Sequence, residues 1–150
     1  MRILIQRVSQ SSVTIEGKIK SSIGNGLLLF VGIEEADDAE DIEWLVGKIC
    51  RLRIFDDANG IMNLSIQEVN GEILVISQFT LHAMVKKGNR PSYIRAARPE
   101  AAIPLYESFL KTIKETSGLN VLSGEFGADM KINLINDGPV TIYIDSKIRE

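Results

Sequence analysis

The sequence has very few of the residues that commonly build metal centres and covalent catalytic sites. Its 150 residues include one cysteine, Cys50, and one histidine, His82. One cysteine cannot form a disulfide within the chain, and its place in an apolar helical pattern is typical of a buried thiol in a reducing cytosol. This scarcity disfavours a Cys/His zinc cluster and a Ser-His-Asp triad. We therefore expect no metal site and no cofactor.

Long hydrophobic segments are also missing. The longest apolar run covers about residues 26–33, whereas a membrane-spanning helix needs about 20 apolar residues. Residues 1–8 alternate in polarity and carry two arginines, unlike the apolar block of a secretory signal. We expect no membrane segment and a cytoplasmic location.

A strong positive charge is absent as well. The net charge is −3, whereas proteins that grip long stretches of nucleic acid are usually strongly basic. Acidic residues gather in residues 34–43, and basic residues gather in residues 86–98. Any contact with nucleic acid is therefore expected to be local, and DNA is not an expected partner.

What remains is the composition of an ordinary globular protein. Hydrophobic residues make up 45% of the chain and charged residues 25%, close to the globular average. A chain of this length usually forms one domain with one core. We expect residues 1–150 to form a single domain.

Strand patterns dominate the sequence. Residues 2–8 and 11–15 alternate in polarity, and a turn at residues 16–18 follows them, so the N-terminal part is predicted to be a β-meander. Residues 27–31 and 73–76 are continuous apolar runs, typical of strands covered on both faces. Residues 132–144 indicate two strands or one interrupted strand.

Two segments have helical spacing. Apolar residues recur at that spacing from Asp38 to Leu52, behind an acidic first turn. A second helix follows Pro99 and ends at Gly118; because Pro104 lacks a backbone donor, the helix is expected to begin near Ala102. The predicted fold class is α/β, with mixed, largely antiparallel β-sheets, sandwich-like or barrel-like, and two main helices packed on one side.

The segment Ser77, Gln78, Phe79 and Thr80 directly follows a buried strand. It offers hydroxyl groups, an amide, an aromatic face and backbone donors at a strand end, where scaffolds often present functional groups. Neither Ser77 nor Thr80 has an obvious base. Taken alone, the segment is more typical of a strand terminus with capping hydroxyls than of a catalytic site.

The segment Asp137-Gly138-Pro139 is by itself an ordinary turn sequence. Together, however, Ser77-Gln78-Phe79-Thr80-Leu81 and residues 136–141 (NDGPVT) resemble the two active-site motifs of the D-aminoacyl-tRNA deacylases. The resemblance runs from the first residues to Asp145 and includes residues 86–92 and 126–130. Residues 82–85, at the expected edge of the pocket, depart from the family pattern, which often has Tyr-Gly-Asp there.

The resemblance implies a homodimeric hydrolase that removes D-amino acids, and glycine mischarged on tRNA, from the acceptor end of tRNA. Gly138 and Pro139, joined by a cis peptide bond, would enter the partner's pocket and exclude L-amino acids. Arg7, Asn136 and Asp137 would support them, and Met130 would line the pocket. Ser77, Gln78, Phe79 and Thr80 would form the catalytic segment, and Lys86, Lys87 and Arg90 would contact tRNA.

Two questions of mechanism and two rival functions stay open at this point. Backbone N–H groups near Phe79 and Thr80 are the expected oxyanion donors, with a ribose hydroxyl of the tRNA helping to activate water. Thr80 as a covalent nucleophile is the alternative. The rival functions are a non-catalytic module that binds RNA ends and a purely structural dimer in which residues 137–139 form an exposed turn.

Overall fold

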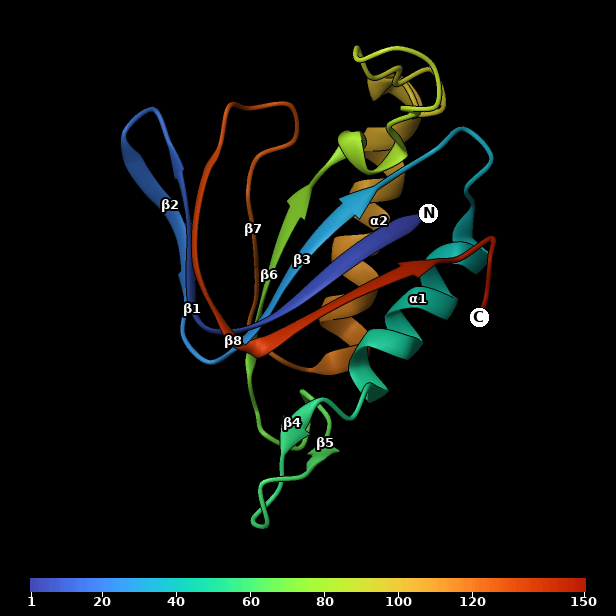
Figure 1. Cartoon of the computed structure of the whole chain (residues 1–150). Coiled ribbons are helices and arrows are strands. Elements are labelled where there is room, and N and C mark those ends of the chain that lie inside the picture. The colour runs from blue at the N-terminus through green and yellow to red at the C-terminus, as the bar shows by residue number, and fades with distance from the viewer.

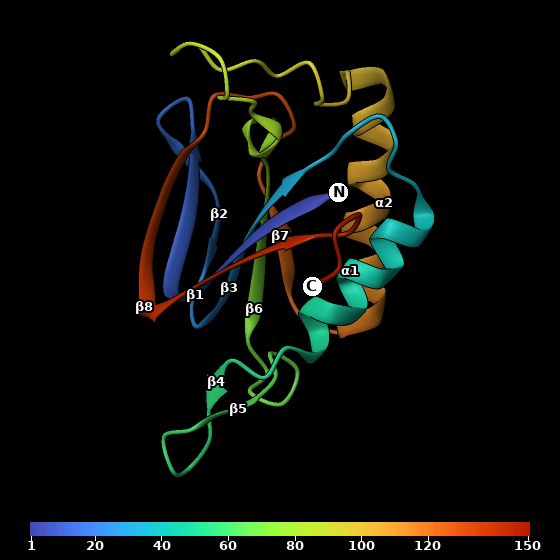
Figure 2. The same cartoon turned by 45° about the vertical axis from the view of Figure 1, so that its right-hand side comes forward.

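The structure is a computed structural model that describes residues 1–150. Its elements in chain order are β1 (Arg2–Ile15), β2 (Lys18–Ile23), β3 (Gly26–Gly32), α1 (Ala39–Arg51), β4 (Phe55–Asp56), β5 (Met62–Leu64), β6 (Glu72–Ser77), the 3-10 helix η1 (Phe79–His82), α2 (Pro99–Ser117), β7 (Val121–Ser123) and β8 (Lys131–Asp145). Figure 1 shows α1 and α2 together beside the main sheet, and Figure 2 shows the same grouping after a turn of the view. No helix is both long and apolar enough to cross a membrane.

Strand β1 is the centre of the sheet. It pairs antiparallel with β3 through its first half, with β2 through its second half, and with β8 along most of its length. The sheet continues from β3 to β6 and from β6 to β7 in parallel pairings. The prediction of a mixed, largely antiparallel and barrel-like sheet with two helices on one side is confirmed.

The continuous apolar strands lie in the middle of this sheet because both of their faces are covered. Leu27 and Leu29 of β3 join a cluster of 21 buried residues that also contains the inner faces of α1 and α2. Leu28 of the same strand joins a second cluster on the opposite face, with Leu74 and Ile76 of β6. Gly26 allows β3 and β6 to approach, since a Cβ atom there would lie 1.9 Å from the Glu72 carbonyl oxygen.

The predicted helix after Asp38 is confirmed as α1. The Asp38 carboxylate accepts hydrogen bonds from the backbone N–H groups of Glu40 and Asp41, and the Asp41 carboxylate accepts one from the backbone N–H of Asp38. This reciprocal capping box satisfies donors that have no partner inside the helix. The residues at helical spacing, including Cys50, face the core.

The predicted start of the second helix was wrong. Helix α2 begins at Pro99 and not near Ala102, and Pro104 lies inside it. Pro99 fits the first helical position, where its fixed φ is favourable and its missing N–H has no partner in any case. Pro104 removes a single hydrogen bond, to the carbonyl of Glu100, and both residues are exposed, so water can satisfy that carbonyl.

The strand boundaries at the two ends of the chain also differ from the sequence pattern. Residues 2–8 and 11–15 belong to one strand, β1, because β8 pairs with both halves. Residues 131–145 likewise form one strand, with register shifts where β8 passes Arg7 and Ser9. The irregular part of β8 is therefore the stretch that contains Gly138 and Pro139.

The chain's one histidine is buried beside the end of β3. His82 is fully buried, and neither ring nitrogen has a hydrogen-bond partner. Burial lowers the pKa of the imidazole below its usual value of 6.5, with a smaller contribution from the charge of Arg2. Below pH 6.5 the His82 imidazole is therefore protonated more readily in the unfolded chain than in the folded chain.

We predict that the free energy of unfolding decreases as the pH falls from 7 to 5, with a contribution from His82 of at most about 1.4 kcal/mol per pH unit. A group with a lowered pKa stabilises the fold fully above its unfolded pKa and loses that contribution as the pH falls. Denaturant unfolding across this pH range measures the slope. His82→Leu should flatten it, and equal slopes for the two proteins would contradict the prediction.

Candidate active site

A pocket of about 260 Å³ lies at the carboxyl end of β6. Its lining residues come from the ends of β3 and β6, from the segment after β6, and from the chain before and at the start of β8: Val31, Ile33, Ile76, Ser77, Gln78, Phe79, Phe126, Gly127, Ala128, Met130 and Ile132. None of these residues carries a side chain that titrates near neutral pH. The pocket therefore offers main-chain groups, hydroxyls, an amide and apolar surface for chemistry.

Three residues of the sequence-predicted catalytic segment, Ser77, Gln78 and Phe79, line this pocket, whereas Thr80 follows them in η1 and is not a lining residue. Ser77 ends β6 opposite Val31, and the backbone N–H of Gln78 donates to the carbonyl of Val31 at 2.7 Å. The Gln78 side-chain amide donates to the Thr80 hydroxyl oxygen at 2.5 Å. That amide is the only side-chain partner of the Thr80 hydroxyl, so no carboxylate or imidazole is hydrogen-bonded to it to act as a base.

Backbone donors are concentrated where the strand turns into η1. Phe79 and Thr80 are the first two residues of this 3-10 helix, and the first N–H groups of a helix have no acceptor within it. Such groups are partially positive and suit an oxyanion. The short helix thus places two main-chain donors next to the pocket.

Phe79, which lines the pocket, forms an aromatic pair with Tyr93. Phe79 is 55% exposed, and its ring packs edge-on against Tyr93, with ring centroids 5.0 Å apart and an interplanar angle of 76°. An exposed aromatic ring is a stacking surface for a nucleic-acid base. The sequence identified Phe79 but gave no sign of Tyr93, because only the fold of residues 83–98 brings the two rings together.

Arg7 holds the irregular stretch of β8. Its Nε donates to the Asp137 carbonyl at 3.1 Å and lies 3.5 Å from the Asp137 carboxylate, while its Nη1 donates to the Ile54 carbonyl at 2.6 Å. Arg7 is 6% exposed, and its planar fork fixes several acceptors at once. The partners Ile54 and Asp56 were missed from the sequence, since nothing in their local pattern points to Arg7.

Asn136 closes the same stretch from the other side. Its side-chain amide donates to the carbonyls of Arg7 at 3.1 Å and Val140 at 3.0 Å, and its carbonyl oxygen accepts from the Thr141 hydroxyl at 3.3 Å. These bonds replace ladder bonds that the irregular strand cannot make. The peptide bond between Gly138 and Pro139 is cis.

Gly138 and Pro139 do not line the pocket of their own chain. Both are exposed and lie beside Arg7, whereas Ser77 lies beside Val31, which pairs with Ile3. The two segments are separated by four residues along β1 and by three strand spacings across the sheet. Together these amount to a distance of roughly 15–20 Å. Within one chain, the two motifs are therefore separate sites.

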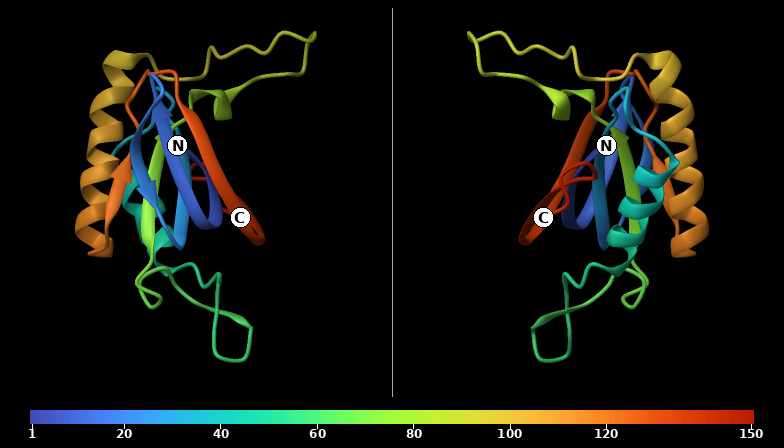
Figure 3. Two further views of the ribbon diagram at one scale, coloured as in Figure 1. Left: turned by 90° about the vertical axis from the view of Figure 1, so that its left-hand side faces the viewer. Right: turned by 90° about the vertical axis from the view of Figure 1, so that its right-hand side faces the viewer.

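The basic residues predicted to contact tRNA lie on the segment between η1 and α2. Lys86, Lys87 and Arg90 are all exposed. Figure 3 shows this segment projecting beyond the sheet, on the side away from the helices. Arg95 in the same segment is tied to the body of the protein through Glu34, at 3.1 Å.

The chain is similar to known proteins over its whole length. A protein-family model for D-Tyr-tRNA(Tyr) deacylase matches residues 4–145. Curated relatives named D-aminoacyl-tRNA deacylase include a protein of Flavobacterium johnsoniae, 61% identical, and one of Bacteroides thetaiotaomicron, 64% identical. Each match covers 100% of both chains.

Two solved structures have the same fold. One, named c-Myc DNA Unwinding Element Binding Protein, has a TM-score of 0.91 and 40% identity, covering 97% of this chain and 98% of its own. The other, named as a probable eukaryotic D-amino acid tRNA deacylase, has a TM-score of 0.81 over 95% of this chain and 97% of its own. At 19% identity, the second shows the fold alone.

Residues 77–81 and 136–141 first indicated the resemblance to this family. The family model matches nearly the entire sequence, and full-length relatives are more than 60% identical. The chain belongs to the D-Tyr-tRNA(Tyr) deacylase family and is a hydrolase.

Proposed function

We propose that the chain hydrolyses the ester bond between a D-amino acid, or glycine, and the terminal ribose of tRNA, in a pocket completed by a second copy of the chain. The observation that carries the proposal is the firm bracing of an exposed main-chain segment. Residues 137–139 are exposed, yet Arg7 donates a hydrogen bond to the Asp137 carbonyl, and Asn136 donates one to the carbonyl of Val140, directly after Pro139. A turn that is exposed to solvent and has no function does not require hydrogen bonds from a buried arginine to fix its main chain.

Assembly with a second copy would bring the two separate motifs together. The pocket in one chain has a volume of about 260 Å³, near the low end for a ligand site, and a second copy would extend it. Large apolar side chains are exposed on Phe79, which lines the pocket, and on Val85 and Ile94 of the segment that follows η1, and exposed apolar patches commonly mark interfaces. In a two-fold dimer, Gly138 and Pro139 of each chain would enter the pocket of the other.

Handedness would be read by exclusion. Main-chain carbonyl groups held beside the α-carbon leave room for a hydrogen atom but collide with a side chain on that side. An L-amino acid is refused, a D-side chain points away, and glycine passes because it has no β-carbon. Because main-chain atoms would make the selection, D-amino acids with different side chains should all be accepted.

The chemical step needs no strong base from the protein. Water adds to the ester carbonyl carbon, and the N–H groups of Phe79 and Thr80 stabilise the resulting oxyanion. The neighbouring ribose hydroxyl helps to take the proton of the attacking water. The tetrahedral species then breaks the bond to the ribose oxygen, which takes up a proton, and releases the free amino acid and tRNA.

The tRNA would be held by its terminal adenine and by its acceptor-stem phosphates. The half-exposed ring of Phe79 offers the adenine a stacking surface worth about 1–3 kcal/mol. Lys86, Lys87 and Arg90 extend from the body on the projecting segment. We propose a cytoplasmic location, where charged tRNA is used.

The first prediction from the proposed function concerns the handedness of the amino acid. With D-tyrosyl-tRNA the protein should release tyrosine, and L-tyrosyl-tRNA should be spared. Gly138→Ala should lower D-specific release at least tenfold or relax selectivity, because Gly138 has a φ of 128° and an added Cβ would lie 3.0 Å from Arg7 Nη2 and 2.9 Å from Val140 Cγ2. Radiolabelled aminoacyl-tRNA measures both rates.

Gly60→Ala is the matched control for this measurement. Gly60, in the turn between β4 and β5, also has a positive φ, 73°, but a Cβ there meets nothing within 4 Å. It should keep both rate and selectivity. Binding of tRNA without release would favour the RNA-end-binding rival, and an unchanged Gly138→Ala enzyme would favour the structural-dimer rival.

The second prediction concerns Thr80. Because its hydroxyl is hydrogen-bonded to the Gln78 amide and to no base, we expect Thr80→Ala and Thr80→Ser to differ by less than about tenfold in kcat. Single-turnover kinetics with D-tyrosyl-tRNA measure the rates. Loss of turnover in Thr80→Ala with activity retained in Thr80→Ser would instead identify a covalent nucleophile.

The third prediction concerns salt. Contacts from Lys86, Lys87 and Arg90 to phosphates predict a slope of log K against log salt of about −2 to −3, and each Lys→Ala or Arg→Ala change should reduce its size by about 1. Lys18 is exposed at the start of β2 and lies outside this segment, so Lys18→Ala should leave the slope unchanged. A duplex DNA that competes as well as tRNA would contradict the expectation that DNA is not a partner.

A further inference from the structure

The α-amino group at the first residue is buried inside the protein. Met1 has no exposed surface, and its ammonium group donates hydrogen bonds to the Asp37 carboxylate and, at 2.8 Å, to the Ser146 hydroxyl oxygen. The side chains of Met1 and Asp37 both have zero exposure. A buried charge is tolerated only when it is paired and hydrogen-bonded, so this ammonium has a site built for it.

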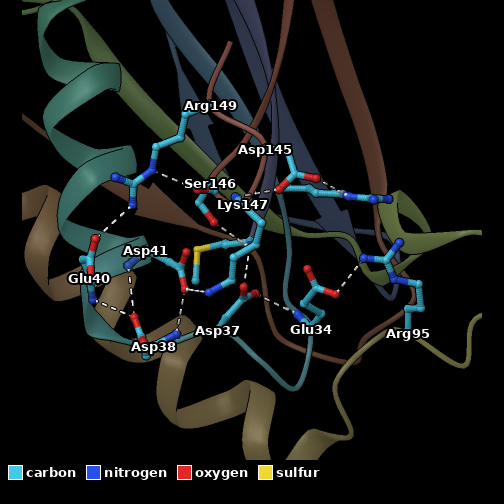
Figure 4. Close-up of polar contacts among 12 residues, drawn as sticks. Glu34, Asp37, Asp38, Glu40, Asp41, Arg95, Asp145, Ser146, Lys147 and Arg149 are labelled. Carbon is cyan, nitrogen blue, oxygen red and sulfur yellow. Dashed lines mark hydrogen bonds and ion pairs between the residues drawn. The ribbon is translucent and has the colours of Figure 1, made fainter.

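The same site joins the loop before α1 to the C-terminal segment. The Asp37 carboxylate also accepts from the backbone N–H of Glu34 at 2.8 Å, and the backbone N–H of Ser146 donates to the Met1 carbonyl at 2.9 Å. Figure 4 shows Asp37 and Ser146 within a network that continues to Asp41 and Lys147, which are 2.6 Å apart. Losing the ammonium would therefore leave the Asp37 carboxylate buried without its charge partner.

The next residue connects this site to the catalytic segment. Arg2 Nε donates to the Asp145 carboxylate at 2.9 Å, and Arg2 Nη1 donates to the Leu81 carbonyl at 2.9 Å. Leu81 belongs to η1 and directly follows Thr80. Asp145 and Ser146 are neighbours, so the anchored ammonium and the guanidinium are attached to one short stretch of chain.

We propose that the free ammonium of Met1 and the guanidinium of Arg2 are positioning groups for η1, so that acylation of the amino group slows deacylation. An acyl group removes the positive charge and adds atoms where no surface is exposed. The start of β1 must then shift, and Arg2 moves with it. The proposal rests on the catalytic role proposed for the segment at residues 77–80.

One chain in two chemical forms tests this proposal. Translation in a reconstituted system without peptide deformylase gives N-formyl-Met1, and translation with the deformylase present, which acts before the chain folds, gives the free amine in the same sequence. We expect the formylated form to melt at least about 6 °C lower, since breaking a buried ion pair is strongly destabilising. At a temperature where both forms are folded, its kcat on D-tyrosyl-tRNA should be at least tenfold lower, with KM within about twofold.

Variants of Arg2 separate positioning from simple folding. Arg2→Lys keeps a charge but cannot serve Asp145 and the Leu81 carbonyl together, so kcat should fall between the values of the parent and Arg2→Ala, again with little change in KM. Glu40→Gln is the control, because it breaks the exposed Arg149–Glu40 ion pair in the same region without touching Met1. It should keep both melting temperature and kcat.

The outcomes that overturn the proposal are distinct. Equal melting temperatures and equal kcat for the two forms overturn it, and so does a lower melting temperature with unchanged kcat. Reaction of the Met1 amine with an amine-labelling reagent as fast as that of an unfolded peptide shows that the ammonium is not buried. If the deformylated chain releases no D-amino acid, the proposed function fails, while the melting and labelling measurements still test the burial of the amine.

Discussion

The pairing of β1 along both of its edges is the constraint on which the remaining structure depends. With β3 and β2 on one edge and β8 on the other, β1 has little freedom to shift register, because a slip of one residue would turn its buried side chains outward. Both arginines that support the proposed site stand on this strand. Arg2 contacts Leu81 beside the proposed catalytic segment, and Arg7 contacts Asp137 beside Gly138.

The pocket has no side chains that titrate near neutral pH. Catalysis there, as proposed, would depend on how neutral groups are positioned. Hydroxyls, amides and main-chain N–H groups stabilise charge only when they are held at the right place before the reaction begins. The structure has rigid supports suited to that demand: the parallel pairing of β6 with β3 up to Ser77, the Gln78–Thr80 hydrogen bond, and the bonds of Arg7 and Asn136 around the irregular part of β8. An already activated ester substrate is compatible with such a site.

Much of the fold follows from local patterns in the sequence. The apolar runs at residues 27–31 and 73–76 correctly indicated strands covered on both faces, and the helical spacing after Asp38 correctly indicated α1. The start of α2 was misjudged because the cost of Pro104 depends on whether the freed carbonyl of Glu100 is exposed, which the local sequence does not state. The two halves of β1 looked separate because the pairing that joins them comes from β8, more than a hundred residues away.

The sequence by itself determined the family, the two motifs and the residue types available for chemistry, because these are properties of consecutive residues. Only the tertiary structure decided which distant groups meet. Arg7 reaches the Ile54 carbonyl, Tyr93 packs on Phe79, and the Met1 ammonium is enclosed by Asp37 and Ser146. Such contacts join residues separated by 14 to 145 positions, and their positions follow from strand pairing and core packing over the whole chain, which no short pattern encodes.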